Sequence, residues 1–201
     1  MTKWILIIVS LSIFQSCQKK AETPVDTPTT TPSGARFTLL PPETTGITFS
    51  NFANNFKEDY NYNIFVYEYM YNGGGVATGD VNGDNLPDIY FTSTFGPDKL
   101  YINLGDFKFL DVTDKAGVGA KVGFKTGTTM ADINGDGKLD IYVCRTSKTD
   151  DGQKTDHVYI NVGNKTENGM TIPQFEDQTK KLGLEDNSNT NHATFFDYDR
   201  D

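Results

Sequence analysis

The chain is poor in the side chains that most enzymes and zinc proteins use for chemistry. It has 201 residues but only two cysteines and two histidines. No disulfide framework can be proposed from Cys17 and Cys144, and neither His157 nor His192 belongs to a cluster with the spacing of a zinc site. A Gly-x-Ser-x-Gly elbow and a phosphate-binding loop are also missing. We therefore predict no catalytic site, and we expect both histidines to be polar strand or loop residues.

Positive charge and long apolar runs are also scarce. The chain has 18 Lys and Arg against 27 Asp and Glu, which gives a formal net charge of −9. Such a surface repels phosphates, so nucleic acid is not an expected partner. The longest apolar run covers residues 4–14, which is too short for a transmembrane helix because about 20 residues are needed. The 36% of hydrophobic residues is nevertheless enough for a packed core.

The N-terminus has the organisation of an export signal. Lys3 precedes the apolar run, and Gln15-Ser16-Cys17 follows it, as expected of a signal peptide over residues 1–17. With a small residue before Cys17, it resembles a bacterial lipoprotein signal, which implies lipidation of Cys17 and anchoring to a bacterial membrane, at the outer membrane, cell surface or periplasm. Ordinary secretion with an incidental cysteine is the alternative. Residues 18–36 are rich in Thr and Pro and suit an extended tether before a domain at 37–201.

The strongest positive signal is an eleven-residue pattern that occurs twice, at 80–90 and 132–142. Each copy places oxygen-bearing side chains at loop positions 1, 3, 5 and 9, and position 7 offers a backbone carbonyl. Calcium takes six to eight oxygen ligands, so we predict calcium sites in the loops 80–88 and 132–140, with water completing the shell. Ordinary acidic turns are the alternative, because Asp, Asn and Gly dominate turns without any metal. The predicted ligands are Asp80, Asn82, Asp84, Leu86 and Asp88, and Asp132, Asn134, Asp136, Lys138 and Asp140, with Leu86 and Lys138 acting through the backbone.

These loops do not fit an EF-hand. An EF-hand needs a helix on each side and a Glu at position 12, where this chain has Phe91 or Val143. The residues after each loop are β-branched and aromatic, so each loop is expected to lead into a strand. Gly83, Gly135 and Gly137 provide positive φ angles, and Asn85 takes the place of a fourth glycine. Asparagine is the next most tolerant residue for that conformation.

The repeat extends beyond the loops. Residues 98–103 match 156–161, and residues 109–113 match 175–179. Four strand-like runs occur in the first unit, at 76–78, 89–93, 99–103 and 107–112, and four short strands per repeat are typical of a propeller blade. The second unit is longer because of polar insertions at 146–155 and 163–170. A third copy begins at 197–201, with Asp197, Asp199 and Asp201 as partial ligands. We therefore expect an all-β fold, present as an N-terminal fragment of about two blades and the start of a third.

Residues 75–80, the two Asp-x-Asn-Gly-Asp loops, residues 100–103 and residues 195–199 resemble the FG-GAP/VCBS repeats of cartilage-acidic-protein-like bacterial proteins. The resemblance covers residues 37–201. It implies an integrin-α-like β-propeller that binds calcium at its blade loops and is often followed by an ASPIC/UnbV domain.

The leading functional hypothesis is a membrane-anchored, extracytoplasmic, calcium-binding propeller that mediates protein or glycan binding and adhesion. The first alternative is a non-catalytic scaffold within a larger exported enzyme whose active site lies beyond residue 201, and the second is a purely architectural surface protein. The aromatic run at 60–71 is expected to pack between blades, although its rings could stack on a sugar or a peptide. Cys144 is expected to be a buried, unreactive thiol.

Overall fold

A computed structural model describes residues 37–51, 72–120, 123–146 and 155–199. The chain divides into two compact units, Met1–Leu39 and Leu40–Asp201, and every described helix and strand belongs to the second. Among the described residues no helix is long and apolar enough to span a bilayer. Predictions for Cys17, the tether, the aromatic run at 60–71 and Asp201 concern positions outside these ranges. The elements are α1 (Pro42–Thr45), β1 (Val76–Gly79), β2 (Asp88–Phe91), β3 (Lys99–Asn103), β4 (Phe109–Asp111), α2 (Thr113–Ala116), β5 (Phe124–Ala131), β6 (Asp140–Thr146), β7 (His157–Glu167) and β8 (Met170–Asp177).

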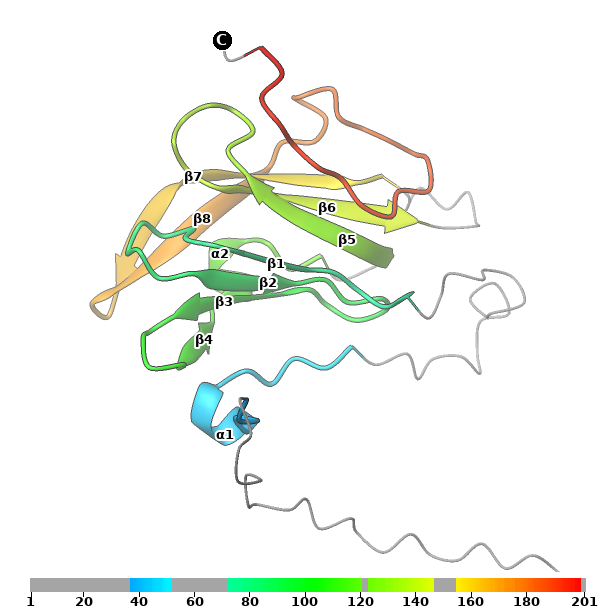
Figure 1. Ribbon diagram of the computed structural model, residues 1–201. Coiled ribbons are helices and arrows are strands. Elements are labelled where there is room, and N and C mark those ends of the chain that lie inside the picture. The colour runs from blue at the N-terminus through cyan, green and yellow to red at the C-terminus, as the bar shows by residue number, and fades with distance from the viewer. Residues whose placement is uncertain (1–36, 52–71, 121–122, 147–154, 200–201) are drawn as a thin grey trace, which may run out of the picture. The chain divides into compact units, whose positions relative to one another are not determined.

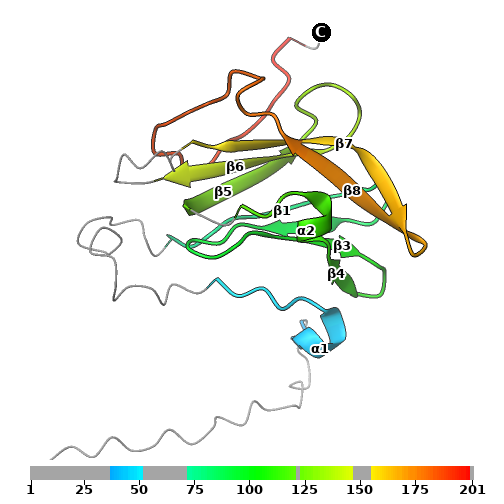
Figure 2. The same ribbon diagram turned by 180° about the vertical axis from the view of Figure 1, so that it is seen from behind.

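The strands form two antiparallel sheets, each with its four strands in chain order. The first has the order β1-β2-β3-β4 and the second β5-β6-β7-β8. Neighbouring strands are joined by short connections, as in the blades of a propeller. Figure 1 shows the two sheets stacked face to face, and Figure 2 shows the same layers from behind. The predicted fold class, all-β with four-stranded blades, is confirmed.

Three of the four strands predicted in the first unit differ from the structure by one or two residues at their ends, and two differences from the sequence prediction have a clear structural reason. The fourth strand begins at Phe109 instead of residue 107, because Gly105, Asp106 and Phe107 all have positive φ angles and form the turn after β3. The stretch 163–170, predicted to be a polar insertion, is mostly a paired extension of the β7–β8 hairpin. Its polar side chains are compatible with a strand because the residues of β7 from Val162 to Glu167 are exposed or half-buried.

The main core lies between the two sheets. Tyr90, Leu100 and Ile102 of the first sheet pack in one cluster with Ile141, Val143 and Tyr159 of the second. Because side chains alternate along a strand, the intervening residues of the second sheet face the other way. Tyr142, Cys144, Val158 and Ile160 form that second cluster, which packs against Ala193. Cys144 is fully buried, as predicted, and burial raises its thiol pKa to about 12.

Successive inner strands touch backbone to backbone. A Cβ atom on Gly75, just before β1, would lie 2.8 Å from the amide nitrogen of Thr128 in β5. A Cβ atom on Gly127 would lie 2.5 Å from the carbonyl oxygen of Asn191, to which the Gly127 amide donates a 2.9 Å hydrogen bond. Real Cβ atoms do not approach backbone so closely, so both positions require glycine. The same contact thus occurs between β1 and β5 and between β5 and the segment that follows the second sheet.

Candidate metal sites in two repeated loops

The first loop is organised around the carboxylate of Asp80. Its Oδ1 atom accepts hydrogen bonds from the amides of Gly83 (2.7 Å) and Asp84 (3.2 Å), and its Oδ2 atom accepts one from Asn85 (2.8 Å). The Asp84 carboxylate accepts from the Leu86 amide at 2.8 Å. These bonds require two left-handed residues, and Gly83 (φ 82°) and Asn85 (φ 67°) occupy that region as the sequence predicted.

The second loop repeats this arrangement. Asp132 accepts from the amides of Asp136 (3.0 Å) and Gly137 (2.8 Å), and Asp136 accepts from the Lys138 amide (3.0 Å). The position-3 asparagine in each loop accepts from the position-5 amide at 3.0 Å. Both loops therefore have the same local structure, and in both the acidic side chains turn inward toward the backbone amides.

The position-9 aspartates tie each loop to its sheet. Asp88 accepts from the amides of Val81 (2.9 Å) and Asn103 (2.8 Å), and Asp140 makes the equivalent pair of bonds. Both side chains have no solvent exposure. The pKa of Asp88 is raised to about 6, mainly by burial and in smaller part by the nearby charges of Asp84 and Asp80. The pKa of Asp140 is raised for the same reasons.

The donor chemistry suits a hard cation. An ionised carboxylate has about four acceptor sites, and Asp84 and Asp88 each use two, so both retain free lone pairs. All side-chain donors are oxygens, the ligand type that calcium prefers. Within the described ranges, no group of three or more His, Cys, Asp or Glu side chains lies close enough together to hold a metal without rearrangement. Asp197 and Asp199 of the third loop lie in an exposed segment without an assigned strand.

The two loops differ at position 7, where sequence analysis considered only the backbone carbonyl. The Lys138 ammonium lies 2.8 Å from Oδ2 of Asp136 and holds the pKa of that carboxyl below its usual range. Leu86 has no charge to place there. A cation in the second loop would have to displace the Lys138 ammonium from the Asp136 carboxylate or share that carboxylate with it.

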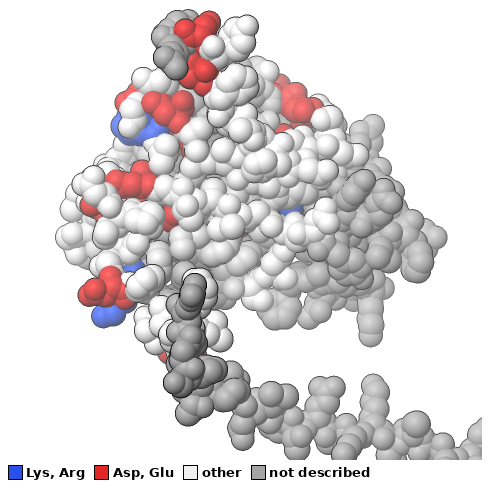
Figure 3. Space-filling view, viewed as in Figure 1, with Lys and Arg blue, Asp and Glu red and all other residues white. Residues whose placement is uncertain are grey.

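Acidic side chains gather at the loop end of the sheets. In the space-filling view, Asp and Glu are concentrated on the left, where Figure 1 shows the β1–β2 and β5–β6 connections, while Lys and Arg appear at only a few points (Figure 3). This field favours the approach of cations.

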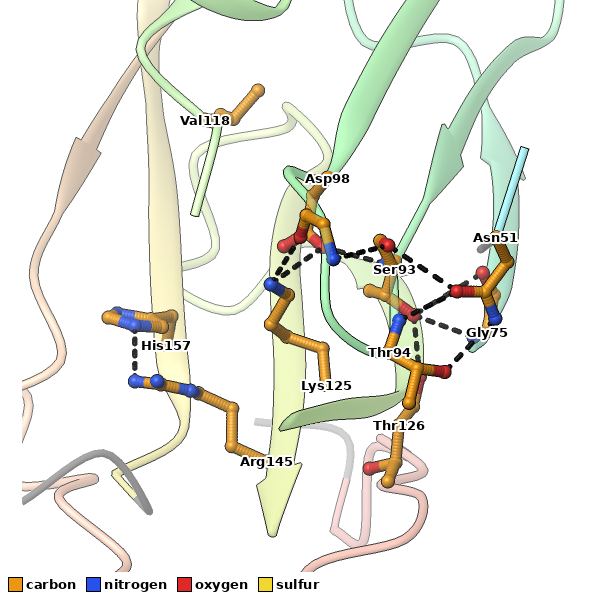
Figure 4. A network of polar contacts seen from close by, with 12 residues as sticks. Asn51, Gly75, Ser93, Thr94, Asp98, Val118, Lys125, Thr126, Arg145 and His157 are labelled. Atoms are coloured by element: carbon orange, nitrogen blue, oxygen red, sulfur yellow. Dashed lines mark hydrogen bonds and ion pairs between the residues drawn. The ribbon is translucent and has the colours of Figure 1, made fainter. Parts of the chain in front are cut away.

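A second polar cluster lies between the sheets, away from the loops (Figure 4). The Lys125 ammonium lies 3.8 Å from Oδ1 of Asp98, and neither side chain is exposed. Asp98 also accepts from the Ser93 amide (2.8 Å) and the Tyr90 hydroxyl (3.2 Å). Burial raises the pKa of Asp98 to about 6 and lowers that of Lys125. The buried charges of Asp98 and Lys125 thus compensate each other, as expected of a structural ion pair.

The repeat also accounts for the position and the hydrogen-bond partner of His157. Its Nδ1 lies 2.8 Å from Oδ2 of Asp177, just as the Lys99 ammonium of the first sheet lies 2.7 Å from Asp111. Its Nε2 lies 2.9 Å from a guanidinium nitrogen of Arg145. Because arginine only donates, Nε2 must accept and Nδ1 must carry the proton. Burial lowers the pKa of His157, so this polar strand residue is held neutral.

Comparison with known proteins agrees with this geometry. Residues 80–143, which contain both loops, match the FG-GAP-like repeat family. The match and the two four-stranded sheets are consistent with a fragment of an integrin-like β-propeller that contains an FG-GAP-like repeat.

The chain is also distantly homologous to cartilage acidic protein 1. It is 39% identical to the Homo sapiens protein and 38% identical to the Xenopus tropicalis protein over 72 residues, which is 35% of this chain. It is 36% identical to the Mus musculus protein over 69 residues. In each case the match spans 11% of the relative's length.

Proposed function

We propose that the chain provides calcium-binding blades of an extracytoplasmic β-propeller that mediates adhesion by binding a protein or glycan ligand. The observation that carries this proposal is the duplicated set of hydrogen bonds from backbone amides, which places inward-turned carboxylates at the same positions in both loops. Ordinary acidic turns do not require such correspondence at four side-chain positions. The acidic loop end and the FG-GAP-like match support the proposal.

In this proposal the chain's own groups position the ligands and calcium supplies the opposing charge. Asp80 and Asp132 are oriented by backbone amides, and the bonds made by Asp88 and Asp140 connect each loop to its third strand. A bound cation would reduce repulsion among the carboxylates of each loop. It would thereby stabilise the β1–β2 and β5–β6 hairpins, and with them the stacked sheets.

Export and anchoring complete the proposal. The signal-like residues 1–17 and the lipoprotein-like Ser16-Cys17 support a lipid anchor at Cys17, with residues 18–36 as the tether to a bacterial membrane. In a bacterial host, Cys17→Ser should abolish incorporation of labelled palmitate, whereas Cys144→Ser should not. Equal labelling of both variants would refute the anchor.

Thermal unfolding of the full chain tests the calcium proposal. Calcium at 100 times its Kd, bound only to the folded state, adds about 2.7 kcal/mol per site. This corresponds to a rise in Tm of roughly 5–10 °C for a domain of this size. The double variant Asp84→Asn/Asp136→Asn should lose the rise, while Asp106→Asn, in the exposed β3–β4 turn, should keep it. A wild-type Tm that is equal in calcium and in chelator would refute the proposal.

A further inference from the structure

One side chain connects the two loops. Asn161 lies in β7, two residues beyond the last residue paired with β6, and is 1% exposed. Its Nδ2 donates to the carbonyl oxygen of Val81 in the first loop (2.8 Å) and to that of Leu139 in the second (3.3 Å). Its backbone amide donates to Oδ1 of Asp140 at 2.8 Å. Asn161 therefore contacts the first loop at Val81, between the predicted ligands Asp80 and Asn82, and it contacts the second loop at its last predicted ligand, Asp140.

Further contacts hold the first loop against the second blade. Asn164 Nδ2 donates to the carbonyl oxygen of Asn82 at 2.8 Å, and Asn82 Nδ2 lies 3.5 Å from the carbonyl oxygen of Thr171. As a result Asn82 is 6% exposed, whereas its counterpart Asn134 is exposed. The conformation of the first loop thus depends on the hairpin of the neighbouring blade.

The first blade contains a matched residue that lacks this connection. Asn103 makes the same bonds inside its own blade, from its amide to Asp88 (2.8 Å) and from Nδ2 to the Pro87 carbonyl (3.0 Å). Among the described residues it makes no bond to a second loop. Substituting Asn103 therefore tests the support that a residue gives to its own loop, whereas substituting Asn161 also tests the connection between the two loops.

We propose that Asn161 is a positioning residue that couples the two loops, so that a cation bound in one loop raises the affinity of the other. This inference rests on the proposed calcium function. Ordering the second loop fixes the Leu139 carbonyl and the Asp140 carboxylate, which together fix the Asn161 side chain. Asn161 then holds the Val81 carbonyl, and with it the backbone between Asp80 and Asn82. The coupling is reciprocal by thermodynamic necessity.

Calorimetric titration of the full chain with calcium chloride tests the coupling. Disabling the second loop with Asp136→Asn should weaken binding at the first by about fivefold, the lower end of typical coupling. In an Asn161→Ala background, Asp136→Asn should leave first-loop affinity unchanged. In an Asn103→Ala background, first-loop affinity should be lower overall, but the fivefold dependence on the second loop should persist.

A milder variant keeps the coupling testable if Asn161→Ala does not fold. Asn164 is exposed, so Asn164→Ala should fold normally and reduce the coupling without abolishing it. If both loops bound calcium without coupling, or if the coupling persisted in Asn161→Ala, the inference would be overturned and the proposed function would remain. If the wild-type chain bound no calcium, both the inference and the proposed function would be refuted.

Discussion

Exchanging the position-7 residues should exchange the relative calcium affinities of the two loops. Lys138→Leu gives the second loop the residue of the first, and Leu86→Lys makes the reciprocal change. In the native chain the Lys138 ammonium lies 2.8 Å from a carboxylate oxygen of Asp136, one of the predicted ligands. A cation must compete with that ammonium in the second loop but meets no such competitor in the first.

The expected effect of Lys138→Leu has two parts. An exposed ion pair changes an equilibrium constant by up to about fivefold. A unit positive charge about 6 Å from a divalent ion adds roughly a tenfold penalty in water, and salt screens part of it. Allowing for that screening, we expect second-loop affinity to rise about tenfold in Lys138→Leu and first-loop affinity to fall by a similar factor in Leu86→Lys.

Calorimetric calcium titration at two ionic strengths measures both variants. Lys180→Leu, which removes the same charge from the exposed segment after β8, is the control and should change affinity less than twofold. The reasoning is wrong if Lys138→Leu binds calcium no more tightly than this control, or if the gain does not shrink as salt increases.

Three further predictions concern stability. The pKa of Asp98 is about 6 in the folded chain, above the ordinary aspartate value of 3.8. Because the folded state binds this proton more tightly than the unfolded state, the contribution of Asp98 to stability falls as pH rises through this interval. The loss reaches about 3 kcal/mol by pH 7. Urea unfolding at pH 5 and pH 7 should show a pH dependence about 1 kcal/mol weaker in Asp98→Asn than in wild type, and identical dependence would contradict the assignment. Gly127→Ala should lower the free energy of unfolding by about 1–3 kcal/mol, since its Cβ would lie 2.5 Å from the Asn191 carbonyl, and an unchanged urea midpoint would argue against that contact. At Asn85, with φ 67°, replacement by Gly should be nearly neutral and replacement by Ala should cost about 1 kcal/mol in the same assay, whereas equal stabilities would exclude backbone strain as the reason for Asn.

The loops and blades were predictable because their signals are local and repeated. The spacing of Asp, Asn and Gly specifies the turn, and the β-branched and aromatic residues after it specify a strand. The duplication then indicates sheets that must stack to bury both faces. Even the left-handed conformation of Asn85 follows from the alignment of the two loops.

The remaining features depend on contacts between distant residues. Val81 and Asn161 belong to different blades, and nothing in the sequence near either residue indicates that they bond. The same holds for Lys125 and Asp98, whose buried pair is visible only once the sheets are stacked. The repeat could have signalled the pairing of His157 with Asp177, because Lys99 and Asp111 occupy the equivalent positions.

A crystal structure of the full chain grown in calcium tests the central claim most directly. The account predicts one ion in each repeated loop, bound by Asp80, Asn82, Asp84 and Asp88 and by their counterparts, with the Lys138 ammonium displaced from Asp136. Loops that remain without an ion at saturating calcium, with Lys138 still paired to Asp136, would contradict it.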